Sequence, residues 1–400
     1  MSRLLPRAAL FRLAGRLTRQ SASPAPPGRI VVVKPDHMGD VLLASPALHT
    51  LRLMFPKAAI TLAVGPRGED VARRLPDADR IIALPFPGLD PATQPGVAAR
   101  WSLLVRVARQ WQGSFDAGLL LRDDYYWGAL LLAAAGIGTR AGTATPLCAP
   151  FLTHAVTPVP HEPAAAQHLR VVAALTGGAR DSPVWSLEHA LRFAPRTAPT
   201  VAVTQRVAAG LGPDEPYLLL HPGSGAAVKL WTAENWTAVL RDLRSRLGLR
   251  TLVMAGHNEQ HLLPPILRHA GNNAVGLAAA PDIDLLSELM LGARLVLGVD
   301  SGPLHLAAAL DVPSVRLYGP VDPLVFGPWG DPRRHRSVAS RMLCAPCGKL
   351  HWDLLDLPWH PCVRRLAPDA VVAAALAALE AAAAANAAVQ VMPPGDLLLP

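Results

Sequence analysis

The 400-residue chain has little charge, few aromatic side chains and few cysteines. Charged residues make up 17% of it, aromatic residues make up 5%, and four residues are cysteine. Four cysteines in a chain of this length do not form a disulfide scaffold, so a reducing cytoplasm is the expected compartment. No uninterrupted apolar run is long enough to span a bilayer. The nearest, 370–391, is built from weakly hydrophobic alanines and contains Glu380 and Asn386. We therefore expect a soluble protein.

Three motifs of common nucleotide and hydrolase sites are also missing. No G-x-G-x-x-G follows the first predicted strand, and the sequence contains no G-x-x-x-x-G-K-[ST] and no G-x-S-x-G. These absences disfavour a dinucleotide dehydrogenase, a P-loop NTPase and a serine hydrolase.

The sequence is basic, with a formal net charge of +8. The basic residues are spread along the chain without a zinc finger, basic-region helix or aromatic RNA-binding motif, so nucleic acid is not an expected partner. Such a charge suits a protein that works beside an anionic surface or binds phosphorylated substrates. In residues 1–19, five arginines alternate with leucine and phenylalanine. That spacing fits a basic amphipathic helix at the cytoplasmic leaflet, or an extension without that role.

Short apolar runs alternate with helical patterns along most of the chain. Two series of strands are expected, at 29–33, 59–64, 80–83, 117–121 and 139–142, and then at 217–221, 250–255, 274–276, 295–299 and 314–318. The expected helices include 41–55, 97–111, 127–135, 232–247 and 371–391. Such alternation predicts mainly parallel sheets covered on both faces. The expected fold class is α/β, with two doubly wound Rossmann-like domains facing a cleft.

Changes in composition divide the chain into five parts. These are a basic N-terminal extension at 1–28, a first domain at 29–194, a Pro-rich linker region at 195–216, a second domain at 217–368, and an Ala-rich helix and tail at 369–400. A chain of this length exceeds one comfortable hydrophobic core, which supports two domains. Ligands of doubly wound domains bind beyond the carboxyl ends of the strands, so the loops there are the candidate sites.

The first polar loop, KPDHMGD at 34–40, joins an expected strand to an expected helix. Gly39 permits a tight turn, and Asp40 would stand at the helix N-terminus. An aspartate has a pKa of about 3.9, so it is ionised at neutral pH and can accept a proton from an attacking hydroxyl. The alternative is an ordinary N-cap aspartate.

A second loop, HPGSG at 221–225, is followed by Lys229. Its small residues let backbone N–H groups approach phosphate oxygens, and the lysine adds a point charge. A plain strand-to-helix loop is the alternative.

A third loop, DSGPLH at 300–305, follows an apolar strand. Asp300 would end the strand, Ser301 and Gly302 would expose N–H groups at a helix N-terminus, and His305 would lie one turn further. Several charge-assisted hydrogen bonds from such a loop could hold a nucleotide diphosphate. The alternative is a capped helix with a solvent-facing histidine.

Taken in order, these loops resemble glycosyltransferase family 9, the ADP-heptose:lipopolysaccharide heptosyltransferase-like proteins. The resemblance covers about residues 29 to 368 and rests on VVVKPDHMGDVLLASPALHTLR, LLRDDYYWGALLLAAAGIGTRAG, LLLHPGSGAAVKLWTAENW, VMAGHNEQ, LVLGVDSGPLHLAAAL and LYGPVDP. It implies a GT-B architecture, with the acceptor on the side of the first domain and a nucleotide sugar held by the second. It also implies an inverting, metal-independent transfer that requires no cofactor.

The resemblance places the catalytic base at Asp40. Donor contacts would fall on the matched residues Ser224, Lys229, Glu259, Asp300, Ser301, Gly302 and His305. The implied function is transfer of a sugar, heptose from ADP-heptose, to a hydroxyl of a lipopolysaccharide or related surface-glycan acceptor. The implied acceptor is a glycolipid at the inner face of the cytoplasmic membrane. A non-catalytic nucleotide-sugar-binding or scaffold protein of the same fold, and a transferase of another sugar nucleotide, remain open.

The last cysteines form a cluster in the sequence. Cys344 and Cys347 make a C-x-x-C pair, Cys362 follows, and His351 and His360 lie between. Three thiolates and a histidine could hold a structural zinc ion, whereas the alternative is unligated thiols in a loop.

Overall fold

The computed structural model describes residues 26–89, 96–178, 186–196, 199–353 and 355–391. The expected N-terminal amphipathic helix and the end of the C-terminal tail lie outside these ranges. The chain divides into two compact units, the first ending at Ala194 and the second beginning at Pro195.

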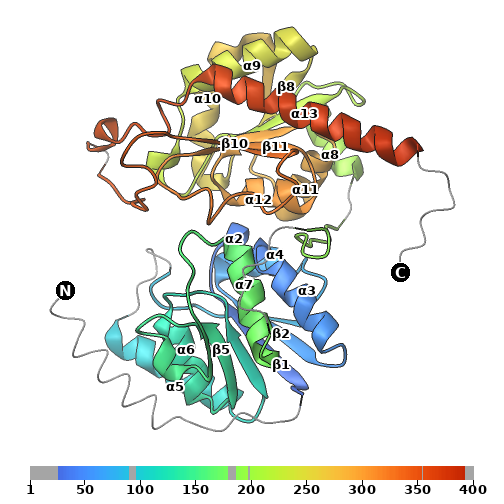
Figure 1. The fold of residues 1–400 in the computed structure, drawn as a ribbon. Coiled ribbons are helices and arrows are strands. Elements are labelled where there is room, and N and C mark those ends of the chain that lie inside the picture. The colour runs from blue at the N-terminus through green and yellow to red at the C-terminus, as the bar shows by residue number, and fades with distance from the viewer. Residues whose placement is uncertain (1–25, 90–95, 179–185, 197–198, 354, 392–400) are drawn as a thin grey trace. The chain divides into compact units, whose positions relative to one another are not determined.

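Unit 1 is a six-stranded sheet with the order β3-β2-β1-β4-β5-β6, in which every pairing is parallel (Figure 1). Its strands are β1 (Arg29–Lys34), β2 (Ala59–Val64), β3 (Arg80–Ala83), β4 (Ala117–Leu120), β5 (Thr139–Thr143) and β6 (His154–Val156). Its helices are α2 (Met38–Leu42), α3 (Ser45–Met54), α4 (Glu69–Ala72), α5 (Val97–Trp111), α6 (Tyr126–Ala134) and α7 (Ala164–Ala173).

Unit 2 repeats this plan with the order β12-β11-β10-β7-β8-β9, again wholly parallel. Its strands are β7 (Tyr217–His221), β8 (Arg250–Val253), β9 (Ala274–Gly276), β10 (Val296–Val299), β11 (Ser314–Tyr318) and β12 (His335–Ala339). Its helices are α8 (Pro199–Ala208), α9 (Ala233–Leu247), α10 (Leu263–Ala270), α11 (Ile283–Leu291), α12 (Gly302–Ala309) and α13 (Pro368–Val391).

The expected α/β class with two doubly wound, Rossmann-like domains is confirmed. All ten expected strands are present, because β-branched and leucine-rich runs such as IVVV in β1 are buried on both faces of a parallel sheet. The strands β6 and β12 were not expected. They lie at sheet edges and carry alternating exposed side chains, so they have no continuous apolar run to mark them.

The helix expected at 41–55 is two helices, α2 and α3, separated by two residues. Pro46 occupies the first turn of α3, where its missing N–H costs nothing, but it cannot continue a helix from the preceding residues. The hydroxyl of Ser45 donates to the carbonyl oxygen of Leu42 at 2.7 Å across the break.

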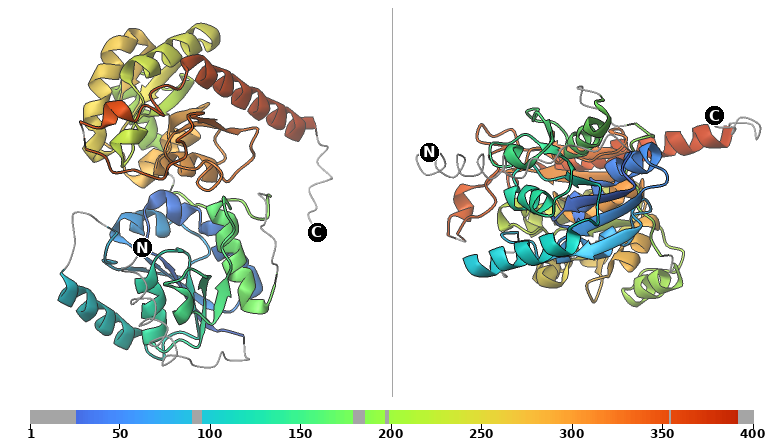
Figure 2. Two further views of the ribbon diagram at one scale, coloured as in Figure 1. Left: turned by 60° about the vertical axis from the view of Figure 1, so that its left-hand side comes forward. Right: turned by 90° about the horizontal axis from the view of Figure 1, so that it is seen from below.

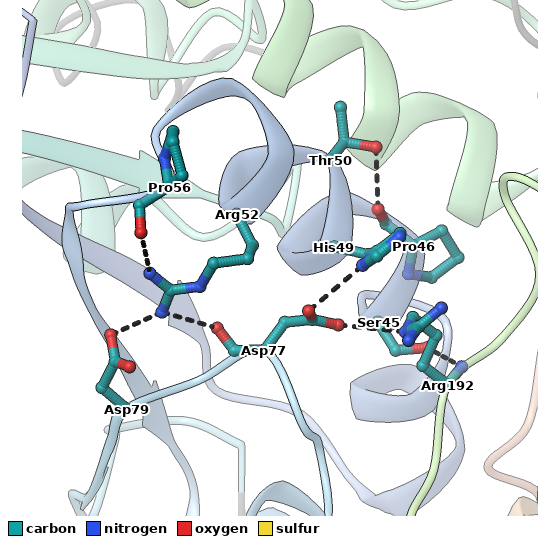
Figure 3. Close-up of polar contacts among 9 residues, drawn as sticks. All are labelled: Ser45, Pro46, His49, Thr50, Arg52, Pro56, Asp77, Asp79 and Arg192. Atoms are coloured by element: carbon teal, nitrogen blue, oxygen red, sulfur yellow. Dashed lines mark hydrogen bonds and ion pairs between the residues drawn. The ribbon is translucent and has the colours of Figure 1, made fainter. Parts of the chain in front are cut away.

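A polar network fixes the point at which the chain leaves unit 1 (Figure 3). Ser45 Oγ accepts a hydrogen bond from the backbone N–H of Arg192 at 2.9 Å. The carboxylate of Asp77 lies 3.2 Å from Arg192 Nε and 3.1 Å from His49 Nδ1. Arg52, one turn further along α3, donates to the carbonyl oxygen of Asp77 at 3.4 Å. The segment before Ala194 is therefore held against α3.

The stretch 195–216, expected as a linker, contains the helix α8. Ala202 of this helix is buried, and α8 packs on α11 of the same unit. The prolines in this stretch were interpreted as marks of a linker. Pro199 instead occupies the first position of α8, where proline is well tolerated.

The Ala-rich helix α13 lies across unit 2 in Figures 1 and 2. It packs on α9, β11 and β12, and Val371, Ala375 and Ala378 are fully buried. Among the described residues it is the one helix long and apolar enough by composition to cross a membrane. Its buried face shows that it covers the sheet of unit 2.

Candidate active site

Each sheet has one point at which the strand order reverses. In unit 1 this switch point lies between β1 and β4, and in unit 2 it lies between β7 and β10. Loops that leave two neighbouring strands in opposite directions open a crevice at their carboxyl ends, which is the usual ligand position in such sheets. The polar loops expected from the sequence follow β1, β7 and β10.

At the switch point of unit 1, two basic side chains hold one carboxylate. Lys34 is the last residue of β1, and its Nζ lies 3.0 Å from Asp36 Oδ2. Arg122, in the loop after β4, forms an ion pair with the other oxygen of Asp36 and a 2.9 Å hydrogen bond to Asp124. Lys34 and Asp36 are buried. Asp36 therefore joins the loops that follow the two central strands.

Asp40 lies beside this ion-pair cluster, in the single-turn helix α2. Burial raises the pKa of Asp40 above its usual value, Lys34 opposes the shift, and the negative charge of Asp36 adds to it. Among the described residues, no side chain forms a hydrogen bond or ion pair with the Asp40 carboxylate. The carboxylate is thus available to accept a proton, as a general base requires.

At the switch point of unit 2, the loops after β7 and β10 are joined directly. Ser224 Oγ donates to the carbonyl oxygen of Asp300 at 3.3 Å, and Lys229 Nζ lies 3.0 Å from Asp300 Oδ2. Lysine has three N–H donors, so the ammonium keeps donors for a ligand.

The N-terminus of α12 lies in the same loop. Ser301 is the N-cap, Gly302 is the first helical residue, and Ser301 Oγ is buried without a hydrogen-bond partner among the described residues. Backbone N–H groups at a helix N-terminus attract anions, and a buried hydroxyl without a partner costs free energy unless a ligand satisfies it.

Glu259 comes from the loop after β8, the other neighbour of β7. Its Oε2 accepts a hydrogen bond from the backbone N–H of Gly256 at 3.1 Å and lies 3.6 Å from His221 Nε2. A Cβ at Gly223 would stand 2.1 Å from Glu259 Oε2, so a side chain there would displace the Glu259 carboxylate. The structure thus brings Glu259 to the same sheet edge as Ser224 and Asp300.

His305 differs from the expectation that it faces a ligand. Its ring is 5% exposed, and both ring nitrogens lie 3.1 to 3.2 Å from one guanidinium nitrogen of Arg316. The same nitrogen lies 3.1 Å from the hydroxyl of Tyr318. Burial lowers the pKa of His305 well below its usual value, and the charges of Arg316 and Lys229 lower it further. The imidazole is therefore neutral and packed between α12 and β11.

A family model described as glycosyltransferase family 9 (heptosyltransferase) matches residues 104–351, more than half of the chain. The chain belongs to glycosyltransferase family 9.

Curated relatives and solved structures of this family 9 chain agree with that assignment. Lipopolysaccharide heptosyltransferase 1 of Pseudomonas aeruginosa is 33% identical over 142 residues, which cover 34% of this chain and 38% of that protein. Lipooligosaccharide heptosyltransferase 2 of Haemophilus ducreyi is 22% identical over 86% of this chain and 97% of its own length. A family 9 glycosyl transferase from Veillonella parvula superposes with a TM-score of 0.68 at 21% identity, covering 91% of this chain and 99% of that one. ADP-heptose lps heptosyltransferase II of E. coli superposes with a TM-score of 0.64 at 17% identity, covering 89% of this chain and 99% of that one. These superpositions support the GT-B fold.

Sequence reasoning did not single out three charged residues that the structure places beside the candidate site residues, namely Asp36, Arg122 and Arg316. Asp36 and Arg122 are 86 residues apart, and only the β1–β4 pairing brings them together. Arg316 was overlooked because it lies within an apolar strand. A charged residue in a fully buried strand pattern is itself a signal, since such a side chain needs polar partners.

The structure does not show the expected zinc site at Cys344, Cys347 and Cys362. Within the described ranges, no three His, Cys, Asp or Glu side chains are grouped closely enough to hold a metal ion. Cys344 and Cys347 are exposed, whereas Cys362 is buried.

Replacing Asp40 with asparagine should raise the unfolding temperature near neutral pH, because the neutral amide removes a charge that the fold disfavours. A carboxyl group whose pKa is raised by folding lowers the stability of the folded protein. This effect is complete at pH values above the pKa of the folded state and absent at pH values below the pKa of the unfolded state. The advantage of D40N should therefore shrink as the pH falls towards about 4. Thermal unfolding of both proteins across this range measures the effect, with the exposed Asp70→Asn in α4 as the control. A D40N variant less stable than the parent near neutral pH would contradict the raised pKa.

Proposed function

We propose that this chain is an inverting glycosyltransferase that transfers heptose from ADP-heptose to a hydroxyl of a lipopolysaccharide or related surface-glycan acceptor. Membership of family 9 supports the reaction class. The observation that carries the proposal is the contrast between the two sheet edges. Unit 1 presents the unpaired Asp40 carboxylate, and unit 2 presents a helix N-terminus with Lys229 and the unsatisfied hydroxyl of Ser301.

In the proposed reaction, Asp40 accepts the proton of the acceptor hydroxyl while that oxygen bonds to the anomeric carbon of the donor. The bond from this carbon to the diphosphate breaks, and its electron pair leaves with the nucleoside diphosphate. Lys229 and the backbone N–H groups at Ser301 and Gly302 stabilise the charge that develops on the leaving group. Attack opposite the leaving group inverts the anomeric configuration.

The ligands of structural neighbours support the choice of donor. An E. coli heptosyltransferase has been solved with ADP and with ADP-2-deoxy-2-fluoro heptose, and its chains superpose on this one with TM-scores of 0.57 and 0.58. In this proposal the donor site is completed by the remaining matched residues, Ser224, Glu259, Asp300 and His305. His305 contributes through its buried contact with Arg316 and does not face the donor.

The proposed location is cytoplasmic, with peripheral attachment at the inner face of the cytoplasmic membrane, where a glycolipid acceptor would be presented. The names of the relatives support such an acceptor, and the net charge of +8 favours an anionic surface.

A titration of the purified protein with ADP, UDP, GDP, CDP and dTDP tests the donor. ADP should bind most tightly, and Lys229→Ala should weaken ADP binding by about tenfold or more, because a charge-assisted hydrogen bond contributes about 1.5 to 3 kcal/mol. Lys57→Ala, an exposed lysine of unit 1, should bind like the parent. Tighter binding of another nucleotide would contradict ADP-heptose as the donor and indicate a transferase that uses another sugar nucleotide. No binding of any nucleotide would favour a non-catalytic protein.

Asp40→Asn should reduce turnover by about two to four orders of magnitude while ADP binds as before, because the variant loses proton acceptance and keeps the donor edge. Release of ADP in the presence of acceptor measures turnover, and Asp70→Asn is the matched control. Full activity of D40N would remove Asp40 from the role of base.

A structural zinc ion at Cys344, Cys347 and Cys362 stays a separate prediction. Burial raises the pKa of Cys362, and the neighbouring thiols of Cys347 and Cys344 raise it further, so the three sulfur atoms influence one another. Elemental analysis of the purified protein should find about one zinc per chain, and less in Cys347→Ser. A metal-free parent protein would show that the cysteines are ordinary thiols.

A further inference from the structure

Helix α5 carries an apolar stripe that the sheet of unit 1 does not use. Its buried stripe comprises Leu103, Leu104, Val107, Ala108 and Trp111, which pack in the core. A second set, Val97, Trp101 and Val105, is 71%, 46% and 46% exposed. Figure 2 shows α5, the teal helix of unit 1, at the outside of its layer in both views.

These three exposed residues form a continuous stripe. They are spaced four residues apart, and each step of four advances about 40° around a helix that turns about 100° per residue. All three therefore lie within about 80° of one another. The apolar face of α5 is wider than the face that packs on the sheet.

The charged residues of α5 are all basic. Arg109 lies one turn after Val105, about 40° further around the helix, and Arg106 lies about 60° beyond Arg109, both exposed. Neither α5 nor its neighbour α6 contains a single aspartate or glutamate. The helix is thus basic and amphipathic, with tryptophan in its outward-facing apolar stripe.

We propose that the outer face of α5 lies in the headgroup region of an anionic membrane, with Val97, Trp101 and Val105 inserted and Arg106 and Arg109 on lipid phosphates. Basic amphipathic helices bind membrane surfaces in this way, and tryptophan favours the interface. A second copy of the chain is a poorer occupant, because a symmetric contact would bring the arginines of both copies together without a carboxylate on α5 or α6 to compensate.

The topology gives this contact a consequence for the site. Helix α5 follows β3 and precedes β4, so its N-terminal half begins at the carboxyl edge of the sheet, which also carries Asp40 and Arg122. Binding through α5 would hold that edge near the lipid surface. The proposal rests on the membrane location proposed above and names the surface that makes the contact. Binding of α5 to the membrane does not depend on transferase activity.

Flotation of the full chain with vesicles of phosphatidylglycerol and phosphatidylcholine, compared with phosphatidylcholine alone, tests the proposal. The parent should float with the anionic vesicles. The double variant R106Q/R109Q should bind these vesicles at least about tenfold more weakly than the parent, because each basic residue near the surface adds to the attraction. Trp101→Ser should also reduce binding. Val201→Ser in α8, where the valine is 49% exposed, should float like the parent.

The N-terminal residues are present in every variant, so any difference belongs to α5. Equal flotation of the parent, W101S and R106Q/R109Q would overturn the proposal. Light scattering offers a second test: if the parent self-associates and W101S abolishes this association but still binds vesicles, the stripe is a contact between copies of the chain and the proposal is wrong. Circular dichroism checks that each variant folds. Titration of W101S with ADP should match the parent, so failure of the docking surface and failure of the proposed donor site remain distinguishable.

Discussion

The polar chemistry of both units depends on the burial of their central strands. A parallel strand covered on both faces has no solvated position along its length, so charged groups gather where it ends, and a charged residue inside it, such as Arg316, needs buried polar partners. Strand β1 is buried except at its first residue and β7 is buried throughout, and crossovers leave each of them in opposite directions. The crevice expected beside each strand is therefore a place where the loops after two neighbouring strands supply polar groups together. Asp36 meets Arg122 in the first crevice, and Ser224 meets Asp300 in the second.

The carboxylates in these crevices divide into paired and unpaired groups. Asp36 is held by Lys34 and Arg122, and Asp300 is held by Lys229. A buried ion pair adds little net stability, because desolvation offsets most of its Coulomb energy. Its effect is geometric, since the carboxylate fixes the direction of a cation that still has free donors. Asp40 has no such partner among the described residues, and its raised pKa reflects the cost of holding that charge in place.

The fold class and ten of the twelve described strands could be predicted from the sequence, and so could the loops that carry the candidate residues, because each depends on a local pattern. A run such as IVVV marks a buried strand without reference to its neighbours, and the small residues of DSGPLH mark a helix start. Contacts set by the tertiary fold could not be predicted. The pairing of Asp36 with Arg122 requires the β1–β4 register, and the buried position of His305 depends on its contact with Arg316 in β11. The edge strand β12 has too few apolar residues for its pattern to indicate a strand.

The pKa shifts also decide which groups can set the pH dependence of the proposed reaction. Burial and neighbouring cations lower the pKa of His305, and burial lowers that of His168, beneath Lys34, to about 3. Both histidines are therefore neutral across the range in which a carboxylate with a raised pKa titrates. Protonation of Asp40 would therefore lower activity on acidification in the proposed reaction, whereas these two buried histidines would not change their charge there.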